Sequence, residues 1–351
     1  MKVQLTPTRA VENFAAPYVI AELGSNHNGD MALAEKLIRA AKAAGADAIK
    51  FQSWSKDSIF SKQVYDDNFF LKDDYRDRKD YTLEKIVDEY SISEAQLLDM
   101  KKIADEVGID MISTPFSKKE VDFLVDKLNA PFIKVASMDV NNYPLLRYIA
   151  KKGRPIVMST GLSTLSEVDK AIATIEAEGN TQIVILHCIS IYPPDDSQVN
   201  LNNIKTYQTA YPYPVGFSDH TLGTSVPLAS VALGACVIEK HFTLDKTMPG
   251  WDHKVSANEQ EMETICTESK RIAAAMGTSR VMSPESQERK DAFRRSIVAA
   301  RDIKAGEVIG EDDIDAKRPG TGLPPEAEGY IVGKPAKRDI AKDQLLSQDD
   351  F

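Results

Sequence analysis

The residues that could do chemistry in this sequence include two histidines at the ends of short apolar runs. His220 follows Ser218 by two positions, and His241 follows Glu239 by two positions. Because side chains alternate along a strand, each histidine would share a face with that polar residue. Two imidazoles from neighbouring strands, with Glu239 or Asp252 nearby, could hold a divalent cation that keeps positions open for water or substrate. The alternative, hydrogen-bonded structural histidines, remains open from these residues alone.

Cations on apolar runs form a second group of candidates. The chain carries a formal net charge of −10, so an anionic ligand would depend on a few local cations. Lys50, Lys134 and Arg318 are the cations we expect to offset a phosphate and a carboxylate. A lysine on a buried strand needs a partner to stay charged. A salt bridge to Glu22 or Glu239 is the structural alternative.

Polar side chains recur late in, or just after, eight short apolar and β-branched runs. Such runs are typical of parallel strands that are buried on both faces. The runs are residues 18–24 (YVIAELG), 48–52 (AIKFQ), 110–116 (DMISTPF), 131–137 (PFIKVAS), 155–160 (PIVMST), 183–188 (IVILHC), 215–220 (VGFSDH) and 236–241 (CVIEKH). Active sites of (β/α)8 barrels lie at the carboxyl ends of the strands, so this placement favours one shared site.

Segments with helical spacing separate these runs. Apolar residues at positions 34, 37, 38 and 41 repeat at i, i+3, i+4 and i+7, after Asp30 as a predicted N-cap. Thr164 to Glu167 and Ser93 to Gln96 have the spacing of capping boxes. Eight such units predict an α/β fold, a (β/α)8 TIM barrel. An open doubly wound sheet is the alternative, although GxGxxG is missing after the first run.

Two segments depart from this pattern. The connection over residues 53–90 is long enough to be a lid or binding loop, or an insertion with its own small helix. Near the carboxyl terminus, polar sequence precedes short runs with glycine at the turns, which predicts a small, mostly β module. The predicted division is residues 1–280 for the barrel, 281–292 for a linker and 293–351 for the module.

Composition limits the class of protein. The acidic balance argues against a coat for nucleic acid or for an anionic membrane. Three widely spaced cysteines without a CxxC pair argue against a zinc ribbon or a disulfide scaffold. No apolar run approaches the length of a membrane helix, and the first ten residues lack the apolar stretch of a signal peptide. We therefore expect a cytoplasmic protein.

The motifs in these runs resemble those of the sialic acid synthases, which include the legionaminic and pseudaminic acid synthases. They match nearly the whole chain in the right order: IAELGSNHNG (20–29), IKFQ (49–52), STPF (113–116), KVAS (134–137), STG (159–161), LHCISIYP (186–193), GFSDHT (216–221) and IEKHFTLD (238–245). The carboxy-terminal RPGTGL (318–323) resembles the antifreeze-like (SAF) domain of that family.

The resemblance implies condensation of phosphoenolpyruvate with an N-acetylated amino sugar, typically N-acetylmannosamine. The products would be a nine-carbon 2-keto-3-deoxy sugar acid and phosphate, with Mn²⁺, or else Mg²⁺ or Co²⁺, as the cofactor. The implied metal ligands are His220 and His241. The implied phosphoenolpyruvate contacts are Lys50, Thr114, Lys134, Ser137 and Ser218. The positions implied around the sugar and the reacting centre are Glu22, Gln52, Tyr192, Glu239 and Asp252.

Among these residues we predict Glu22, Glu239 and Lys50 as catalytic. Arg318 matches an arginine that the SAF domain delivers into the barrel of the other subunit, which implies a domain-swapped homodimer. Ser190 stands where asparagine is expected in members that use N-acetylmannosamine, and residues 250–254 (GWDHK) differ from the usual GPDH. The acceptor could therefore instead be a diacetamido-trideoxyhexose.

Two rival functions remain open from the sequence. One is a non-catalytic sugar-acid or ice-binding protein, which would not need the strand-end charges. The other is a related synthase for a phosphorylated aldose, which would call for a second basic cluster. No such cluster is evident beyond Lys254 and the tail.

Overall fold

The computed structural model describes residues 1–68, 82–281 and 283–351. By their internal contacts these residues form two compact units, Met1–Gly277 and Thr278–Phe351. The division falls three residues before the predicted end of the barrel. Each unit is considered by itself below.

The first unit is built on eight parallel strands, as predicted. They are β3 (Tyr18–Gly24), β4 (Ala48–Gln52), β5 (Asp110–Thr114), β6 (Ile133–Val135), β7 (Ile156–Ser159), β8 (Ile183–Cys188), β9 (Val215–Asp219) and β10 (Val237–His241). Their order is β5-β4-β3-β10-β9-β8-β7-β6, and the two end strands β5 and β6 lie against each other. The strands therefore curl into a barrel, and the open doubly wound sheet is excluded.

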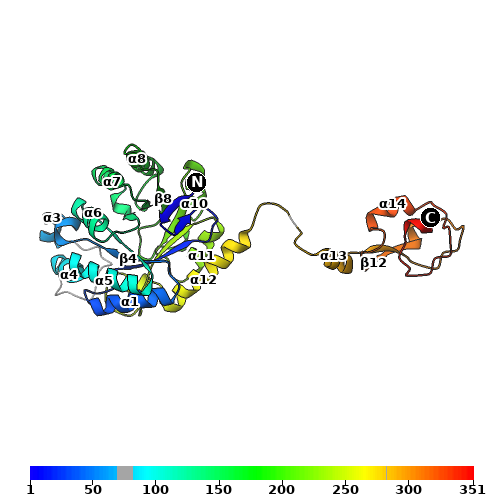
Figure 1. Cartoon of the computed structure of the whole chain (residues 1–351), viewed down its shortest axis with the longest axis horizontal. Helices are drawn as coiled ribbons and strands as arrows, with labels where there is room; N and C mark the ends of the chain where they lie inside the picture. The colour runs from blue at the N-terminus through cyan, green and yellow to red at the C-terminus, as the bar shows by residue number, and fades with distance from the viewer. Residues whose placement is uncertain (69–81, 282) are drawn as a thin grey trace. The chain divides into compact units, whose positions relative to one another are not determined.

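Helices surround the strands, as Figure 1 shows. They are α1 (Met31–Ala43), α5 (Glu94–Val107), α6 (Lys118–Asp122) continued by the single turn η1 (Phe123–Lys127), α7 (Tyr143–Lys151), α8 (Leu165–Glu176), α10 (Asn203–Ala210), α11 (Ser225–Ala232) and α12 (Glu259–Met276). The predicted caps are confirmed: Asp30 accepts a hydrogen bond from Ala32, and both predicted capping boxes form. The predicted apolar stripe of α1 is buried against the sheet.

The described part of the long connection after β4 contains three short helices. They are α2 (Lys56–Ile59), α3 (Lys62–Asp66) and α4 (Leu83–Tyr90), and residues 69–81 of the connection lie outside the described part of the chain. Helix α4 buries Ile86 and Val87 in a small apolar cluster with Trp54. The described part of the connection is therefore an insertion with its own core.

The sequence analysis missed a hairpin at the amino terminus. Strands β1 (Val3–Thr6) and β2 (Arg9–Val11) pair antiparallel. Val3, Leu5 and Val11 pack into one cluster with inward-facing barrel residues such as Ile20 and Val157. The hairpin therefore supplies part of the apolar core inside the barrel. Short strands of this kind show too little alternation to stand out in the sequence.

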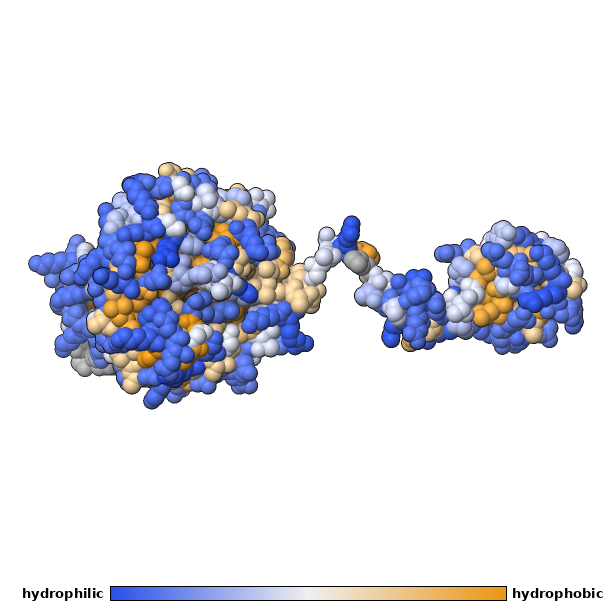
Figure 2. Space-filling model, in the orientation of Figure 1, coloured by the Kyte–Doolittle hydropathy of each residue, from blue (hydrophilic) through white to orange (hydrophobic). Residues whose placement is uncertain are grey.

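The second unit has a short antiparallel sheet of β11 (Ser296–Ala299) and β12 (Ile314–Lys317). Further isolated bridges, the helix α14 (Glu328–Ile331) and a small apolar cluster complete the unit. The segment predicted as a linker is partly helical, because Ser286 caps α13 (Gln287–Phe293). Hydrophilic residues cover much of the visible surface of each unit (Figure 2). Among the described residues, no helix is both long and apolar enough to cross a membrane.

Candidate active site

The strand register brings polar side chains together at the carboxyl end of the barrel. Glu22 pairs with His241 on one side and with Lys50 on the other, and Glu239 pairs with Ser218. A cavity of about 190 Å³ opens there. The predicted residues that line it are Lys50, Gln52, Thr114, Lys134, Ser137, Ser190, Tyr192, Ser218, His220, Glu239 and His241. The fold thus gathers at one site residues that are nearly 200 positions apart.

Two buried lysines and two buried glutamates form an ion network at this cavity. Lys50, Lys134 and Glu239 line the cavity, whereas Glu22 is joined to them through Lys50 and does not line it. Lys50 is paired with Glu22, and its Nζ lies 3.8 Å from Oε2 of Glu239. Lys134 Nζ lies 3.6 Å from Oε1 of Glu239. All four residues are at most 6% exposed. The salt bridge considered as the alternative for Lys50 is therefore present. Lys50 also lines the cavity, so the salt bridge does not exclude a role in binding.

The environment separates the acidities of the two carboxyl groups. Burial raises the pKa of Glu22 to about 7, although Lys50 partly opposes this shift. Burial also acts to raise the pKa of Glu239, but Lys134 and Lys50 together hold it below its usual value. Burial lowers the pKa of Lys134. Pairs of carboxyl groups whose acidities are separated in this way often divide the roles of proton donor and fixed charge.

His220 and His241 lie next to each other, with ring centres 5.5 Å apart. His220 Nδ1 lies 2.7 Å from the Ile189 carbonyl oxygen, which can only accept, so Nδ1 carries the proton and Nε2 keeps a lone pair. Burial lowers the pKa of His241 well below its usual value. Nδ1 of His241 is buried without a hydrogen-bond partner among the described residues, and Asp252 Oδ2 is 3.7 Å away.

These two imidazoles are the described residues that fit a metal ion. The ring of His220 is oriented by a hydrogen bond from Nδ1, as the rings of metal-binding histidines usually are. Nδ1 of His241 is buried and has no hydrogen-bond partner among the described residues. Within the described residues, no group of three or more His, Cys, Asp or Glu side chains is arranged to hold a metal.

Hydroxyl groups form a cradle on the other side of the cavity, where β6, β7 and β8 end. Ser137 Oγ accepts a hydrogen bond of 3.0 Å from the backbone N–H of Gly161. A Cβ atom at Gly161 would overlap Ser190 Oγ and would lie 2.8 Å from Ser137 Oγ. Lys134 Nζ donates to Ser159 Oγ at 2.7 Å. An ammonium, hydroxyls and a backbone N–H converge here, which are groups that bind phosphate.

A second convergence lies where β10, β3 and β4 end. Gly24 has a φ of +45°, and a Cβ there would lie 3.0 Å from Glu22 Oε1, 3.4 Å from Asp252 Oδ2 and 3.4 Å from Gln52 Nε2. Asp252 Oδ2 also accepts a hydrogen bond of 3.2 Å from Ser25 Oγ. Three of the residues predicted around the sugar therefore meet over the backbone of one glycine.

Two further histidines, His187 and His253, are held by neighbouring groups of the fold. His187 stacks on Phe217 and bonds the Val199 carbonyl. His253 lies between Thr243 and Asn28, at 2.7 and 3.1 Å.

Arg318 belongs to the second unit, where its guanidinium lies 4.8 Å from the centre of the Phe293 ring. The contact predicted for it with a substrate in another subunit stays a prediction.

Several residues of the cavity were missed by the sequence reasoning. Cys188 lines it, with Sγ 4.0 Å from Nδ1 of His220, and its thiol is free. Phe116, Met138 and Leu162 are apolar parts of the wall. Each lies at a strand end or in the loop that follows, so position alone could have identified them. They were passed over because apolar and thiol side chains carry no charge signal.

Comparison with known proteins agrees with this geometry. The chain is 37% identical to the N,N'-diacetyllegionaminic acid synthase of Campylobacter jejuni over 94% of this chain and 98% of that protein. It is 36% identical to the pseudaminic acid synthase of the same species, over 95% and 96%. The crystal structure of the N-acetylneuraminic acid synthetase of Leptospira borgpetersenii in complex with citrate superposes with a TM-score of 0.72 at 29% identity, over 83% of this chain and 94% of that one. Residues 37–281 match the model of the NeuB family and residues 294–351 match that of the SAF domain, so the chain belongs to the NeuB family and carries a carboxy-terminal SAF domain.

Proposed function

We propose that this protein condenses phosphoenolpyruvate with an N-acetylated amino sugar, giving a nine-carbon 2-keto-3-deoxy sugar acid and phosphate. The observation that carries the proposal is the placement of Lys50 and Lys134 around Glu239, beside two adjacent imidazoles. N-acetylmannosamine is the first acceptor to consider. A diacetamido-trideoxyhexose is the second, and it is supported by Ser190 and by the similarity to the legionaminic acid synthase.

Phosphoenolpyruvate would bind through the two lysines and the hydroxyl cradle. Lys134, the hydroxyls of Ser137, Ser159 and Ser190, and the N–H of Gly161 would take the phosphate, because they converge on one side of the cavity. Lys50 donates to Thr114 Oγ1 at 3.1 Å and would take the carboxylate. Ser218 is already engaged by Glu239 at 3.1 Å and would orient that carboxylate. The negative charge of bound phosphoenolpyruvate would then offset part of the lysine charge that Glu22 and Glu239 offset without it.

His220 and His241 would hold the divalent cation, with Mn²⁺ as the first candidate and Mg²⁺ or Co²⁺ as alternatives. The chemistry that such a cation supplies when bound is Lewis-acid polarisation of a carbonyl oxygen. The Ile189 carbonyl fixes the ring of His220 for this role. Tyr192, whose ring centre is 4.0 Å from that of His220, covers the pair from the mouth of the cavity.

The chain's own groups would handle the protons. C3 of phosphoenolpyruvate attacks the aldehyde carbon of the sugar, and the aldehyde oxygen takes up a proton as the new carbon–carbon bond forms. Water then adds to C2 and loses one proton, which leaves a hydroxyl group on C2. That hydroxyl gives up its proton as the bond between C2 and the phosphate oxygen breaks, and the products are phosphate and the 2-keto acid. Glu22 is the first candidate for proton transfer, because it lies beside Gln52 and Asp252 on the acceptor side. Glu239, held between the lysines, would remain a fixed charge.

We further propose that the active enzyme is a homodimer in which the SAF domain of one subunit covers the barrel of the other. The residues Met138, Leu162, Ile191, Tyr192 and Leu222 are exposed on the loops that follow β6, β7, β8 and β9. An apolar rim of this kind around a polar cavity is typical of a surface that a partner covers. The exposed Arg318 would add a third cation to the site, and the covering domain would exclude water.

The test is a phosphate-release assay with phosphoenolpyruvate and Mn²⁺, run in parallel with N-acetylmannosamine, diacetamido-trideoxyhexoses and a phosphorylated aldose. We expect release with an N-acetylated acceptor and none without an acceptor. The variant Lys134→Met should lose activity, whereas the exposed Lys151→Met serves as a matched control. Absence of release with every acceptor would contradict the proposal, and release with the phosphorylated aldose alone would favour the rival synthase.

A further inference from the structure

Three aromatic side chains meet beside the acceptor side of the cavity. Trp54 follows β4, Tyr90 ends α4, and Trp251 lies in the loop between β10 and α12. The ring centre of Trp251 is 6.0 Å from that of Tyr90, in a stacked arrangement, and 6.1 Å from that of Trp54. Trp54 and Tyr90 are each 4% exposed. We call these three residues the aromatic clamp.

The aromatic clamp is connected directly to two residues of the candidate site. Trp54 donates a hydrogen bond of 2.9 Å from Nε1 to Oε1 of Gln52, which orients the amide so that its Nε2 faces Glu22 at 3.5 Å. Trp251 is followed in the chain by Asp252. The clamp therefore fixes one neighbour of Glu22 through a hydrogen bond and another through the backbone.

The loop that carries Asp252 has little regular structure of its own. Between β10 and α12 the structure has only the single turn η3 (His253–Val255). Asn28 donates to the Pro249 carbonyl at 2.9 Å, and Asn26 donates to Ser256 Oγ at 2.8 Å, so both ends of the loop are tied to the segment after β3. The clamp adds a contact between these ties, because Trp251 packs against Trp54 and Tyr90 of the insertion.

The two sides of the cavity differ in their relation to the clamp. Gln52 and Asp252 meet over Gly24, at the ends of β10, β3 and β4. The hydroxyl cradle for phosphate stands at the ends of β6, β7 and β8, across the barrel. A perturbation of the clamp should therefore affect the acceptor far more than phosphoenolpyruvate.

We propose that Trp251 is a positioning residue for the acceptor sugar: through the aromatic clamp, the insertion after β4 holds Asp252 and Gln52 in the geometry that selects the acceptor. This inference rests on the proposed condensation. It assigns to the insertion a part in acceptor specificity.

The kinetic test compares Trp251→Ala and Trp251→Phe with the unmodified protein. Without the Trp251 ring, Asp252 and Gln52 should shift, and a shift of about 1 Å in such groups can lower the rate by more than tenfold. We therefore expect Trp251→Ala to raise the KM for the acceptor about tenfold. The KM for phosphoenolpyruvate should stay within about twofold, and Trp251→Phe should recover most of the acceptor KM. Tyr90→Ala, which removes a clamp residue outside the cavity wall, should reproduce the effect.

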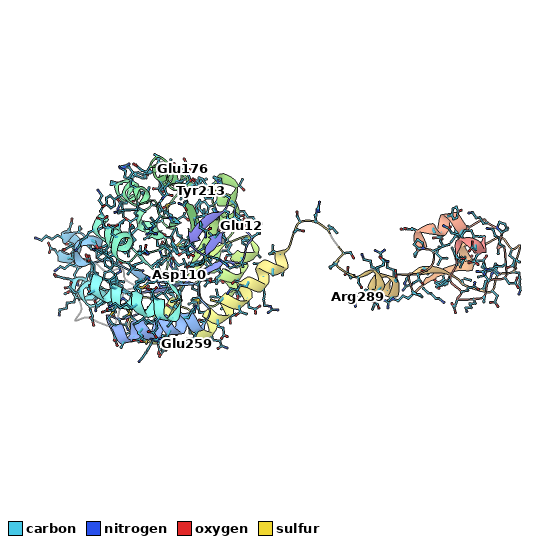
Figure 3. All side chains as sticks on the ribbon, viewed as in Figure 1. Glu12, Asp110, Glu176, Tyr213, Glu259 and Arg289 are labelled. Carbon is cyan, nitrogen blue, oxygen red and sulfur yellow. The ribbon has the colours of Figure 1, made fainter. Side chains whose placement is uncertain are left out.

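The matched control is Tyr213→Ala. Tyr213 is a similarly buried aromatic residue at the amino end of β9, beside Glu176 (Figure 3). This variant should lower the melting temperature without changing either KM. An equal rise of both KM values in Trp251→Ala, or the same acceptor effect in Tyr213→Ala, would overturn the proposal.

Two readouts need no turnover, so they separate failure of this inference from failure of the proposed condensation. Hydrogen exchange in residues 249–257 of the substrate-free protein should be faster in Tyr90→Ala and unchanged in Tyr213→Ala. The chain has two tryptophans, and both belong to the clamp, so intrinsic fluorescence reports on it directly. The tryptophan emission should shift in Tyr90→Ala, because Tyr90 stacks on Trp251. Unchanged exchange and emission would show that the clamp does not hold the loop, whatever the reaction is.

Discussion

Replacing Gly161 by alanine tests the hydroxyl cradle most directly. The residue has no positive φ, so alanine fits its backbone, and the effect must come from the added methyl group. That methyl would overlap Ser190 Oγ and would lie 2.8 Å from Ser137 Oγ. Both hydroxyls must move, by roughly 0.5 to 1 Å, before an ordinary contact is reached.

A displacement of that size in groups that hold a reacting phosphate costs up to about 100-fold in rate. We therefore expect kcat/KM for phosphoenolpyruvate to fall by about 30- to 100-fold in Gly161→Ala, which corresponds to about 2–3 kcal/mol of lost transition-state binding. Initial rates of phosphate release at fixed acceptor measure this. Gly329→Ala is the matched control, because a methyl group at Gly329 meets nothing within 4 Å.

The clash also predicts how two substitutions combine. Ser190→Ala removes the overlapping oxygen and by itself should cost about threefold to tenfold, the loss of one hydrogen bond. The double variant Gly161→Ala with Ser190→Ala should then be more active than additivity predicts, because the clash with Ser190 is gone. If Gly161→Ala keeps its kcat/KM within threefold, or if the two effects simply add, these hydroxyls do not hold the phosphate.

Three further predictions concern stability and the second unit. Asp219→Ala should lower the free energy of unfolding by about 3–5 kcal/mol, because it leaves the ammonium of Lys240 buried without its carboxylate. In urea unfolding, the double variant Asp219→Leu with Lys240→Met should recover most of this loss. Equal losses in the single and the double variant would contradict the role of the ion pair. Burial lowers the pKa of His27 to about 4. Between about pH 6.5 and pH 4 the unfolded chain therefore binds a proton at this residue while the folded protein does not. Through this residue, the free energy of unfolding should fall by about 2 kcal/mol from pH 7 to pH 5. His27→Gln should lose that part of the pH dependence, and an unchanged slope would refute the assignment. Truncation after Gly277 should abolish turnover, and a fully active barrel unit would disprove a catalytic part for the SAF domain.

Local sequence was enough to predict the strands and helices of the barrel. Runs such as residues 183–188 are apolar throughout because a parallel strand in a barrel is buried on both faces, and the predicted bounds of that strand match β8. Capping residues such as Thr164 mark helix starts because their side chains bond the free N–H groups of the first turn. The hairpin β1–β2 escaped detection because its few residues are fixed by packing inside the barrel.

The candidate residues were also evident from the sequence, since charged side chains at the ends of apolar runs are expensive to bury without a role. Their arrangement was not. Strand alternation predicted that His220 shares a face with Ser218, but the 5.5 Å between His220 and His241 follows from the register of β9 and β10.

What the sequence by itself determined is the order of the elements, the barrel and the set of residues at its carboxyl end, because periodicity, capping and burial costs are local properties of the chain. Only the tertiary structure decided which of those residues meet. It placed Glu239 between Lys50 and Lys134, set Ser137 against Gly161, and packed Trp251 on an insertion far from it in the sequence. Contacts of this kind depend on strand register and loop packing over long sequence separations, and no local pattern encodes them.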